Sequence, residues 1–514
     1  MKCHSGHPGH GKPNGAGNVL RMRRIGIDTY LEPVIFMRGD CHICKSEGFE
    51  AFSRVEVWRD HKRIIATLNV VKASFLEIDE AGLSEAAWRA LGGADGDHIR
   101  LFHPAPMQSF SHVRAKMYGH PITMAGADAI MHDIVDGRYS DIEMAAFIAA
   151  CAGNRMDIAE TTAFTQAMIN VGKRLHWGTH PVVDKHCVGG LPGNRTTLIV
   201  VPIVAACGLT IPKTSSRAIT SPAGSADTME VLAPVDLDIP QIRRVVEREN
   251  GCIAWGGAVN LSPADDILIR VERPLGLDSD GQMVASVLSK KIAAGSTHAL
   301  IDLPVGPSAK VRSREAAEEL SARLITVGHS LGIHLETIIT DGSQPVGRGI
   351  GPALEALDVL AVLQNAPGAP ETLRERALLL AGRVLELGGK VAPGSGMQKA
   401  REVLASGLAW NKFQAICEAQ GGMREPPHAQ HTHVIVSKHR GKVAEIDNRR
   451  LARIAKLAGA PKAHAAGLVF HAPLETMVEV GQPLMTIHAE SPGELAYART
   501  YAEAQEDMIL LQER

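Results

Sequence analysis

The sequence predicts a multi-domain α/β protein, and three observations support this fold class. Short β-like runs separated by turn residues fill roughly the first hundred positions, a helical pattern of apolar residues follows, and strand-like runs then alternate with helix-like ones. Alternating β and α segments predict a central sheet with helices on both faces. Aromatic residues make up only 4% of the chain, which favours closely packed helices and α/β layers over aromatic-rich β-sandwiches.

Changes of pattern along the chain predict the domain boundaries. Residues 1–18 are rich in Gly, His and Pro, which is typical of a disordered tail. The remaining chain is expected to divide into four parts: an N-terminal β-rich domain over 19–104, a helical lobe over 105–175 joined by 262–293, a mixed-sheet α/β lobe over 176–261 and 294–428, and a C-terminal α+β domain over 429–514.

Charge and hydropathy exclude several classes of protein. The net charge of −2 gives no electrostatic reason to bind nucleic acid or an anionic membrane. No apolar run reaches the ~20 residues that span a bilayer, and the first residues lack the apolar centre of a signal peptide. Eight scattered cysteines are too few for a disulfide framework, so a reducing, cytoplasmic location is expected.

The stretch "VVDKHCVGGLPGNRTT" (182–197) predicts an anion site. A β-branched run ends in Asp184-Lys185-His186-Cys187, and a glycine-rich turn then leads into an apolar helix-like segment. Such a turn lets the backbone approach a ligand, and the following helix presents free N–H groups to a phosphate. The spacing fits neither the ATP-binding nor the dinucleotide-binding pattern. A structural turn with a surface Lys-His pair is the alternative.

A second segment, "KTSSRAITSPAGSADTMEVL" (213–232), has the same character. It places six hydroxyl side chains within 215–228, together with Arg217, ahead of a predicted helix start. Hydroxyls and a guanidinium can satisfy phosphate oxygens without a metal. The α/β lobe is therefore predicted to bind phosphate, either two groups or one group held from two sides; an ordinary Ser/Thr-rich loop is the alternative.

Three motifs, "DKHCVGG", "SSRAITSPAGSADTME" and "LDSDGQMVASVLSKK", together resemble the thymidine/pyrimidine-nucleoside phosphorylase family. The resemblance covers about residues 20 to 500 and is closest to the long (type 2) branch, which holds AMP phosphorylases and proteins named "putative thymidine phosphorylase". It implies a pentosyltransferase in which inorganic phosphate displaces a base from a nucleoside or nucleotide. It also implies no cofactor, no metal, and a homodimer or larger homo-oligomer.

The resemblance implies roles for particular residues. Phosphate contacts fall to Lys185, Gly190, Ser215 and Ser225, while Cys187 stands where the family has a further phosphate-contacting serine; a thiol is a weaker donor. Asp278 matches the proton donor of the AMP phosphorylase branch, and His186 matches a catalytic position beside base or sugar. The nucleotide- or base-binding positions are Ser216, Arg217, Ala218, Ile219, Thr220, Ser221, Arg270, Ser286, Lys290 and Lys310.

The hydroxyl-rich loop favours a substrate that carries its own 5′-phosphate. The expected reaction is phosphorolysis of a nucleoside 5′-monophosphate (AMP, CMP or UMP type) to free base and ribose 1,5-bisphosphate. The alternatives are thymidine phosphorolysis to thymine and 2-deoxyribose 1-phosphate, a non-catalytic scaffold suggested by Cys187, and a phosphoribosyltransferase. The last needs an acidic metal-binding pair beside the phosphate loop, and none follows "VGGLPGN".

Two other motifs invite a different interpretation. "CHIC" (41–44) has two cysteines but no second pair to complete a zinc site, so we expect a structural turn. "LVFHAPLETMVEVGQPLMTIHAE" (468–490) resembles the hammerhead of lipoyl and biotinyl carriers. Its central "PLETMVEVG" has no lysine to carry a cofactor, so a packing or oligomerisation module is expected.

Overall fold

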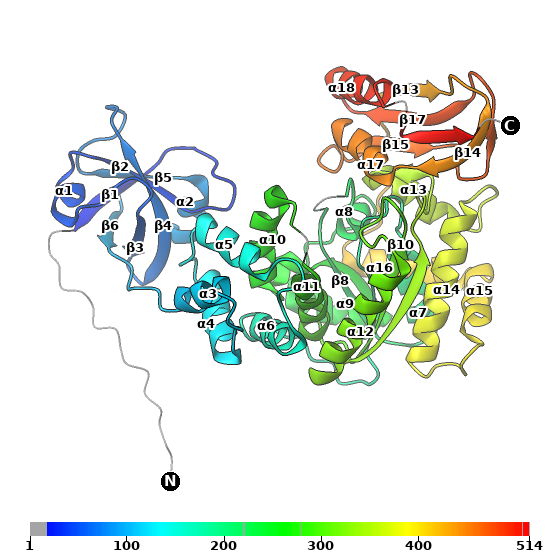
Figure 1. Cartoon of the computed structure of the whole chain (residues 1–514), viewed down its shortest axis with the longest axis horizontal. Helices are drawn as coiled ribbons and strands as arrows, with labels where there is room; N and C mark the ends of the chain where they lie inside the picture. The colour runs from blue at the N-terminus through cyan, green and yellow to red at the C-terminus, as the bar shows by residue number, and fades with distance from the viewer. Residues whose placement is uncertain (1–17, 219–220, 278, 506, 513–514) are drawn as a thin grey trace, which may run out of the picture. The chain divides into compact units, whose positions relative to one another are not determined.

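The computed structural model describes residues 18–218, 221–277, 279–505 and 507–512 of the chain (Figure 1). The chain divides into two compact units. Unit 1 comprises residues 1–118 and 129–147, and unit 2 comprises residues 119–128 and 148–514. The predicted tail, apart from its last residue, lies outside the described residues.

Unit 1 contains a closed six-stranded barrel, which is the predicted β-rich domain. Its strands follow the order β1-β5-β2-β4-β3-β6, and β6 pairs with β1 to close it. Alternate residues of β3 point inward, so Val55 and Val57 are fully buried while their neighbours are not. The strands are β1 (Val19–Arg24), β2 (Val34–Arg38), β3 (Arg54–Arg59), β4 (Lys62–Val71), β5 (Glu80–Leu83) and β6 (His98–Phe102), with helices α1 (His42–Glu47) and α2 (Glu85–Leu91).

The Cys41/Cys44 pair caps a helix of this barrel. The Cys41 sulfur accepts a hydrogen bond from the Cys44 backbone N–H at 3.2 Å, at the start of α1. Both thiols are buried. Among the described residues there is no group of three or more His, Cys, Asp or Glu side chains placed to hold a metal ion. The Cys41 side chain therefore caps α1, which places the pair at the start of a helix rather than in the expected turn.

One of the helical segments begins with a reciprocal capping arrangement. Helix α6 begins with a capping box, in which Asp157 accepts from the Glu160 N–H and the Glu160 carboxylate accepts from the Asp157 N–H. The boundary between the two units runs through α4 and α5, so the helical lobe as one body remains a prediction. The helices are α3 (Phe110–Met117), α4 (Met124–Val135), α5 (Asp141–Cys151), α6 (Ile158–Asn170), α10 (Pro263–Leu275) and α11 (Asp280–Ala293).

Five strands form the sheet of the α/β lobe. A bridge between Val182 and Thr210 joins the β11-β10-β7 sheet to the β8-β9 pair. The lobe is α/β as predicted, but the sheet is parallel at every described pairing rather than mixed, because helices separate consecutive strands. The strands are β7 (Val183–Cys187), β8 (Ile211–Ser215), β9 (Gly251–Trp255), β10 (His298–Val305) and β11 (His334–Asp341).

Helices cover both faces of this sheet. On β10, Leu300 packs into a core with α7 and α13–α16, whereas Ala299 and Ile301 pack into a core with α11 and α12. This alternation explains why the strand reads as a continuous apolar run. The remaining elements are α7 (Thr197–Ala206), α8 (Ser225–Glu230), α9 (Ile239–Glu249), the 3-10 helix η1 (Gly256–Val259), α12 (Arg314–Ser330), α13 (Pro352–Leu363), α14 (Glu371–Leu387), α15 (Gly396–Ala405) and α16 (Leu408–Gln420).

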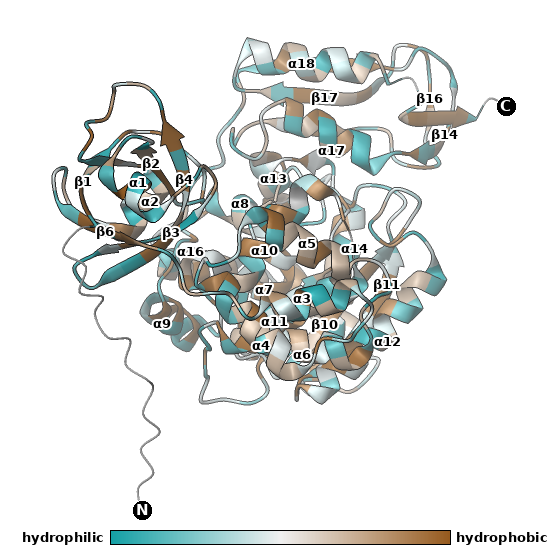
Figure 2. Cartoon of the chain, turned by 60° about the vertical axis from the view of Figure 1, so that its left-hand side comes forward, coloured by the Kyte–Doolittle hydropathy of each residue, from teal (hydrophilic) through white to brown (hydrophobic). Residues whose placement is uncertain are grey.

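The C-terminal module has two small sheets, β12-β15-β17-β13 and β16-β14-β18. Figure 2 shows brown and teal residues along both of its helices, as expected where one face is buried. The hammerhead-like segment 468–490 supplies β15, β16 and β17 to the module's own core. The elements are β12 (Gly349–Ile350), β13 (His431–Val436), β14 (Gly441–Ile446), α17 (Asn448–Leu457), β15 (Gly467–Phe470), β16 (Met477–Val478), β17 (Pro483–Ala489), α18 (Pro492–Glu503) and β18 (Ile509–Gln512).

Across the described parts of both units, no helix has the length and apolar character needed to cross a bilayer.

Candidate active site

The parallel sheet brings both predicted anion-binding segments to one edge. Strand β7 ends at Cys187 and β8 ends at Ser215, and the carboxyl ends of parallel strands lie at the same edge of a sheet. Strand β9 ends beside them at Trp255. Ligands of open α/β sheets bind at this edge. The fold therefore places "DKHCVGG" next to "KTSSRA".

Lys185 lies buried at the end of β7. Its Nζ donates to Thr196 Oγ1 at 2.7 Å, and Thr196 immediately precedes α7. Burial lowers the pKa of Lys185, while the nearby Asp302 opposes this shift. An ammonium beside the N-terminus of a helix is well suited to hold an anion such as phosphate.

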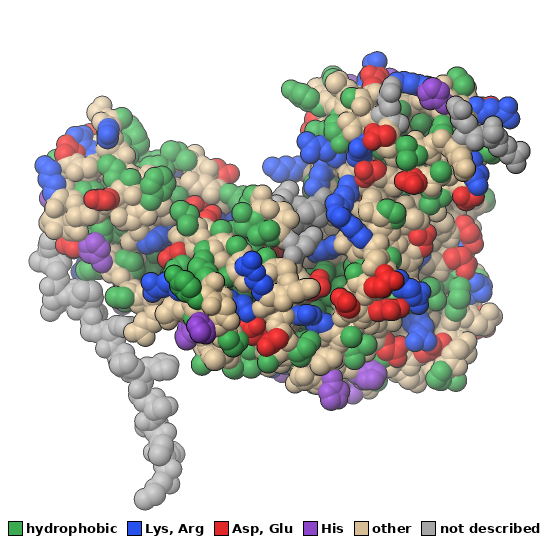
Figure 3. Space-filling model, in the orientation of Figure 1, with side chains coloured by type: hydrophobic (Ala, Val, Ile, Leu, Met, Phe, Trp, Pro, Cys, Tyr) green, Lys and Arg blue, Asp and Glu red, His purple; other side chains and the backbone are tan. Residues whose placement is uncertain are grey.

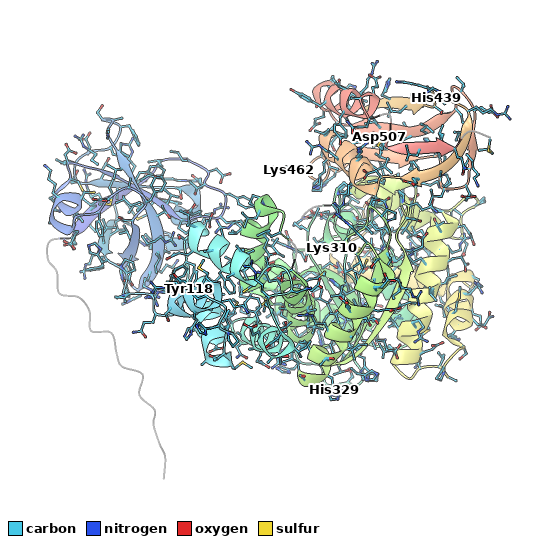
Figure 4. All side chains as sticks on the ribbon, viewed as in Figure 1. Tyr118, Lys310, His329, His439, Lys462 and Asp507 are labelled. Carbon is cyan, nitrogen blue, oxygen red and sulfur yellow. The ribbon has the colours of Figure 1, made fainter. Side chains whose placement is uncertain are left out.

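The glycine-rich turn after β7 brings two predicted residues together. Gly190 has a φ of 81°, and a Cβ built there would lie 2.7 Å from the Lys310 backbone nitrogen. Only glycine fits such a conformation without displacing its neighbour. The predicted nucleotide-binding residue Lys310, which is labelled in Figure 4, is thus held against the predicted phosphate turn.

Cys187 keeps its proton in this environment. The Asn194 side-chain amide donates to its sulfur at 3.4 Å. Burial raises the pKa of Cys187 to about 12, so the side chain is a neutral thiol at neutral pH. A neutral S–H can donate to a phosphate oxygen, but more weakly than the serine hydroxyl that the family resemblance implies.

The hydroxyl-rich loop is closed by Asp227. Its carboxylate accepts from the Ala218 N–H at 2.6 Å and from the Gly224 N–H at 2.8 Å. A Cβ at Gly224 would lie 2.6 Å from the Ser216 carbonyl oxygen, so the two sides of the loop are in contact. Ser215 and Ser225, the predicted phosphate ligands, lie at the two ends of this closed loop.

Arg195 was not predicted from the sequence, and it stabilises the hydroxyl-rich loop through hydrogen bonds. Its guanidinium pairs with the buried Glu355 and donates to the Ser225 hydroxyl at 3.3 Å and to the Ala223 carbonyl at 2.9 Å. Arg195 comes two residues after the "GLPG" turn, but Glu355 is 160 positions away. No local pattern could therefore reveal the pair.

Arg217 is already paired with carboxylates. It donates to Glu230 Oε1 at 2.9 Å and to Asp236 Oδ1 at 3.3 Å, and it lies over the Trp255 ring at 4.7 Å. Glu230 and the neighbouring carboxylates raise the pKa of Arg217. These contacts give Arg217 a structural role, and its contact with substrate remains a prediction. Ile219 and Thr220 lie outside the described residues.

A narrow pocket adjoins the loop, and its lining includes the predicted base-binding residue Lys290. Lys290 pairs with Asp265 Oδ2 at 2.5 Å and donates to the Ser286 hydroxyl at 3.2 Å. The cavity measures about 30 Å³, far below the ~300–1,000 Å³ of ligand pockets, so it is too small to enclose a whole nucleoside. The lining residues are Thr214, Ser215, Ser216, Trp255, Gly256, Gly257, Leu261, Ser262, Asp266 and Lys290.

Several predicted residues lie outside this lining. Arg270 is on α10, the helix that carries Asp266, and His186 is on β7. Asp278, the predicted proton donor, lies outside the described residues.

Asp266 lines the pocket but was not predicted from the sequence. Partial burial and the adjacent Asp265 raise the pKa of Asp266 to about 6, which allows the carboxyl to exchange a proton near neutrality. The Asp-Asp pair at the start of α10 was the only sequence signal for it.

A buried ionic cluster lies under His186. Asp184 is fully buried and contacts Lys291 Nζ at 2.5 Å and Lys213 Nζ at 3.3 Å. Burial alone would raise the pKa of Asp184, but the two lysines hold it below its usual range. Burial, followed by Lys291 and Lys213, lowers the pKa of His186 well below its ordinary value. His186 is therefore a neutral hydrogen-bonding group at neutral pH.

Replacing Lys185 with alanine should weaken phosphate binding. A charge-assisted hydrogen bond is worth about 1.5–3 kcal/mol, so the affinity for phosphate should fall roughly ten- to a hundredfold. The phosphate dependence of base release measures this effect. Lys390→Ala removes an exposed lysine of the same unit and should leave the dependence unchanged. An unaltered dependence in Lys185→Ala would remove Lys185 from the site.

Replacing Asp184 with asparagine should destabilise unit 2. Two buried ammonium groups would lose their carboxylate, and removing one partner of a buried ion pair costs about 3–5 kcal/mol. Thermal unfolding should show a clear fall in melting temperature. Asp79→Asn, which breaks an exposed pair with Arg21, should have a much smaller effect. Equal effects of the two substitutions would contradict the buried cluster.

The same variant has a predicted pH signature. Because the folded-state pKa of Asp184 is lowered, its stabilising contribution is present above the ordinary carboxyl pKa and disappears as the pH falls through the folded-state value. The difference in stability between the wild-type protein and Asp184→Asn should therefore narrow in acid. Unfolding measured at neutral pH and at successively lower pH tests this, and a constant difference would exclude it.

Comparison with known proteins identifies the family. The chain matches the α/β domain of a glycosyl transferase family over residues 179–410 and the helical bundle domain of such a family over 111–172. It also matches the pyrimidine nucleoside phosphorylase C-terminal domain over 442–506. By fold alone, it is similar to anthranilate phosphoribosyltransferase from Thermus thermophilus, with a TM-score of 0.52, 20% identity, and coverage of 60% of this chain and 99% of that one.

Curated relatives match over almost the whole chain. A "Putative thymidine phosphorylase" of Polaromonas sp. strain JS666 is 63% identical over 490 residues, covering 95% of this chain and 96% of the relative. "Putative thymidine phosphorylase 2" of Acidovorax sp. strain JS42 is 61% identical over 503 residues, covering 98% of each. A relative from Hahella chejuensis with the same name as the first is 57% identical and covers 96% of this chain and 98% of its own. The chain therefore belongs to the thymidine/pyrimidine-nucleoside phosphorylase family of glycosyltransferase enzymes.

Proposed function

We propose that the protein catalyses the phosphorolysis of a nucleoside 5′-monophosphate of the AMP, CMP or UMP type. A phosphate oxygen forms a bond to the anomeric carbon, the glycosidic C–N bond breaks, and its electron pair leaves with the base, which takes up a proton. The products are the free base and ribose 1,5-bisphosphate. The observation that carries the phosphorolysis is Lys185, buried at the end of β7 and directed at the start of α7.

Different residues would contact the attacking phosphate and the leaving base. Lys185, the Gly190 turn and the Ser215–Ser225 loop would hold the attacking phosphate. Ser286 and Lys290 would contact the leaving base, whose carbonyl or ring nitrogen gains negative charge as the bond breaks. The Asp265 carboxylate keeps the Lys290 ammonium charged, because it favours the protonated form despite burial.

The leaving base needs a proton or an equivalent hydrogen bond. Asp278 has this role by family resemblance. Asp266 is a further carboxyl in the pocket lining, with its pKa raised to about 6, and it can supply a proton from the α10 side. The neutral His186 can donate one hydrogen bond to base or sugar without adding charge.

The preference for a nucleotide rests on Lys310 and the loop hydroxyls. The Lys310 backbone lies against Gly190, so its side chain originates next to the phosphate turn. Figure 3 shows further Lys and Arg side chains gathered on this side of unit 2, toward the C-terminal module, and Figure 4 labels Lys310 and Lys462 there. These cations supply the positive charge that a substrate with a second phosphate needs.

Thymidine phosphorolysis is the second candidate, and Arg217 favours it. If Glu230 and Asp236 already neutralise the loop's guanidinium, the loop offers hydroxyls but little free positive charge to a 5′-phosphate. An uncharged nucleoside would then be the better ligand. The names of the curated relatives point the same way.

The rates of base release from nucleotides and from the matching nucleosides distinguish the two candidate functions. A site built for a charged group leaves that group's partners unpaired when it is absent, and discrimination can then reach about 10⁴-fold. We expect AMP, CMP or UMP to release base far faster than adenosine, cytidine or uridine at fixed phosphate and without magnesium. If thymidine or uridine reacts as well as its monophosphate, the nucleotide proposal is wrong. Base release that ignores phosphate would indicate another enzyme class, and no release from either set would favour the scaffold.

Replacing Lys310 with alanine gives a residue-level test. Loss of one charge-assisted contact, worth about 1.5–3 kcal/mol, should lower kcat/KM on nucleotides roughly ten- to a hundredfold and change nucleoside turnover little. Arg217→Ala should be measured beside it. An effect confined to nucleotides would place the guanidinium on the substrate, whereas an equal loss on both substrate types would identify a structural role. An unchanged nucleotide preference in Lys310→Ala would contradict the proposed 5′-phosphate contact.

A further inference from the structure

A second cavity, of about 230 Å³, lies at the other end of the parallel sheet. Its walls come from the segments that lead into three strands: 174–182 before β7, 292–297 before β10 and 331–333 before β11. The candidate active site lies at the opposite, carboxyl ends of the strands. At ~3.3 Å per residue, the five residues of β7 separate the two places by roughly 17 Å.

One wall of this cavity carries a buried hydroxyl without a partner. Ser296 is only 7% exposed, and among the described residues its Oγ has no hydrogen-bond partner. The neighbouring Thr297 hydroxyl differs, because it donates to the Val182 carbonyl at 3.1 Å and accepts from the Val182 N–H at 3.0 Å. A buried polar group left unpaired is costly, so a ligand oxygen at Ser296 would be favoured.

The ionisable side chains that line the cavity are all basic. Arg174, His176 and His180 reach the cavity with exposed side chains, and none of them has a hydrogen bond or ion pair with another described residue. The lining includes no Asp or Glu. A cavity with a guanidinium, two imidazoles and a free hydroxyl, and without a carboxylate, selects an anion with several acceptor oxygens.

Apolar side chains make up much of the remaining lining. Leu331 contributes aliphatic surface, whereas Leu175 and Ile333 are buried. The Trp177 indole N–H donates to the Ala294 carbonyl at 2.8 Å, which fixes the ring as a flat wall. Such a surface accommodates the carbon skeleton of a small organic molecule, as in other ligand sites.

We propose that this cavity is a second small-molecule site, which binds the phosphate monoester of a small sugar or polyol. Arg174, His176 and His180 hold the phosphate, Ser296 donates to one of its oxygens or to a sugar hydroxyl, and the sugar lies against Trp177. The site is independent of the proposed reaction, because it shares no lining residue with the candidate active site.

Each cavity contains one tryptophan, which allows the two to be observed separately. Trp177 lines the second cavity and Trp255 lines the active-site pocket. D-ribose 5-phosphate is added to the full-length Trp255→Phe variant, and the change in tryptophan fluorescence is recorded. D-ribose serves as the uncharged control. We expect a saturable change with the phosphate ester only. It should disappear in Trp177→Phe and persist in Lys185→Ala, which impairs the active site.

Two further substitutions locate the ligand. Arg174→Ala should weaken binding about ten- to a hundredfold without altering base release, and Arg174→Lys should restore part of the loss. Ser296→Ala should weaken binding more modestly. The proposal is overturned if D-ribose 5-phosphate gives no saturable change, if D-ribose gives the same change, or if the change is lost in Lys185→Ala and kept in Arg174→Ala. None of these outcomes bears on whether the active site phosphorolyses nucleotides.

Discussion

The arrangement of the site depends on one buried carboxylate. Asp184 on β7 contacts Lys213 on β8 and Lys291 on α11, so a single side chain joins two strands and a helix. A charge in the interior is tolerated only when its partners are correctly placed, so the three elements have little freedom to slide. The residues beside these three, namely Lys185, His186, Thr214, Ser215 and Lys290, form the candidate site. The buried cluster thus fixes their relative positions.

The two faces of strand β7 carry different candidate site residues. Successive side chains of a strand point to opposite sides, and here Lys185 and Cys187 contact Thr196 and Asn194 near α7, whereas Asp184 contacts Lys291 on α11. His186 shares the face of Asp184, and burial together with the lysines on that side lowers its pKa and keeps it neutral. Phosphate would therefore be held on the α7 face and the base on the α11 face. Under the proposed function, the phosphate would attack the anomeric carbon from one side of this strand, and the base would leave toward the other side.

The sequence predicted those features that depend on local pattern. The glycines after β7 and the hydroxyl-rich segment after β8 both have signals within about twenty residues, and the structure places them at the ends of these strands. Contacts between residues far apart in the sequence were not predicted, namely Arg195 with Glu355 and Gly190 with Lys310. Arg217 shows the limit of local reasoning, because a guanidinium in a hydroxyl-rich loop resembles an anion ligand until the fold brings Glu230 and Asp236 to it.

The cluster around Asp184 also explains how a nearly neutral chain can attract phosphate. The whole sequence has a net charge of −2, yet one buried carboxylate stands against two buried lysines, with Lys185 next to it in the chain. These groups lie in a poorly solvated interior, where charges interact more strongly than on the surface and burial lowers the pKa of both Lys185 and Lys291. Replacing such a cluster with apolar residues often costs little stability. The cluster also acts on a residue of the candidate site, because Lys291 and Lys213, after burial, lower the pKa of His186.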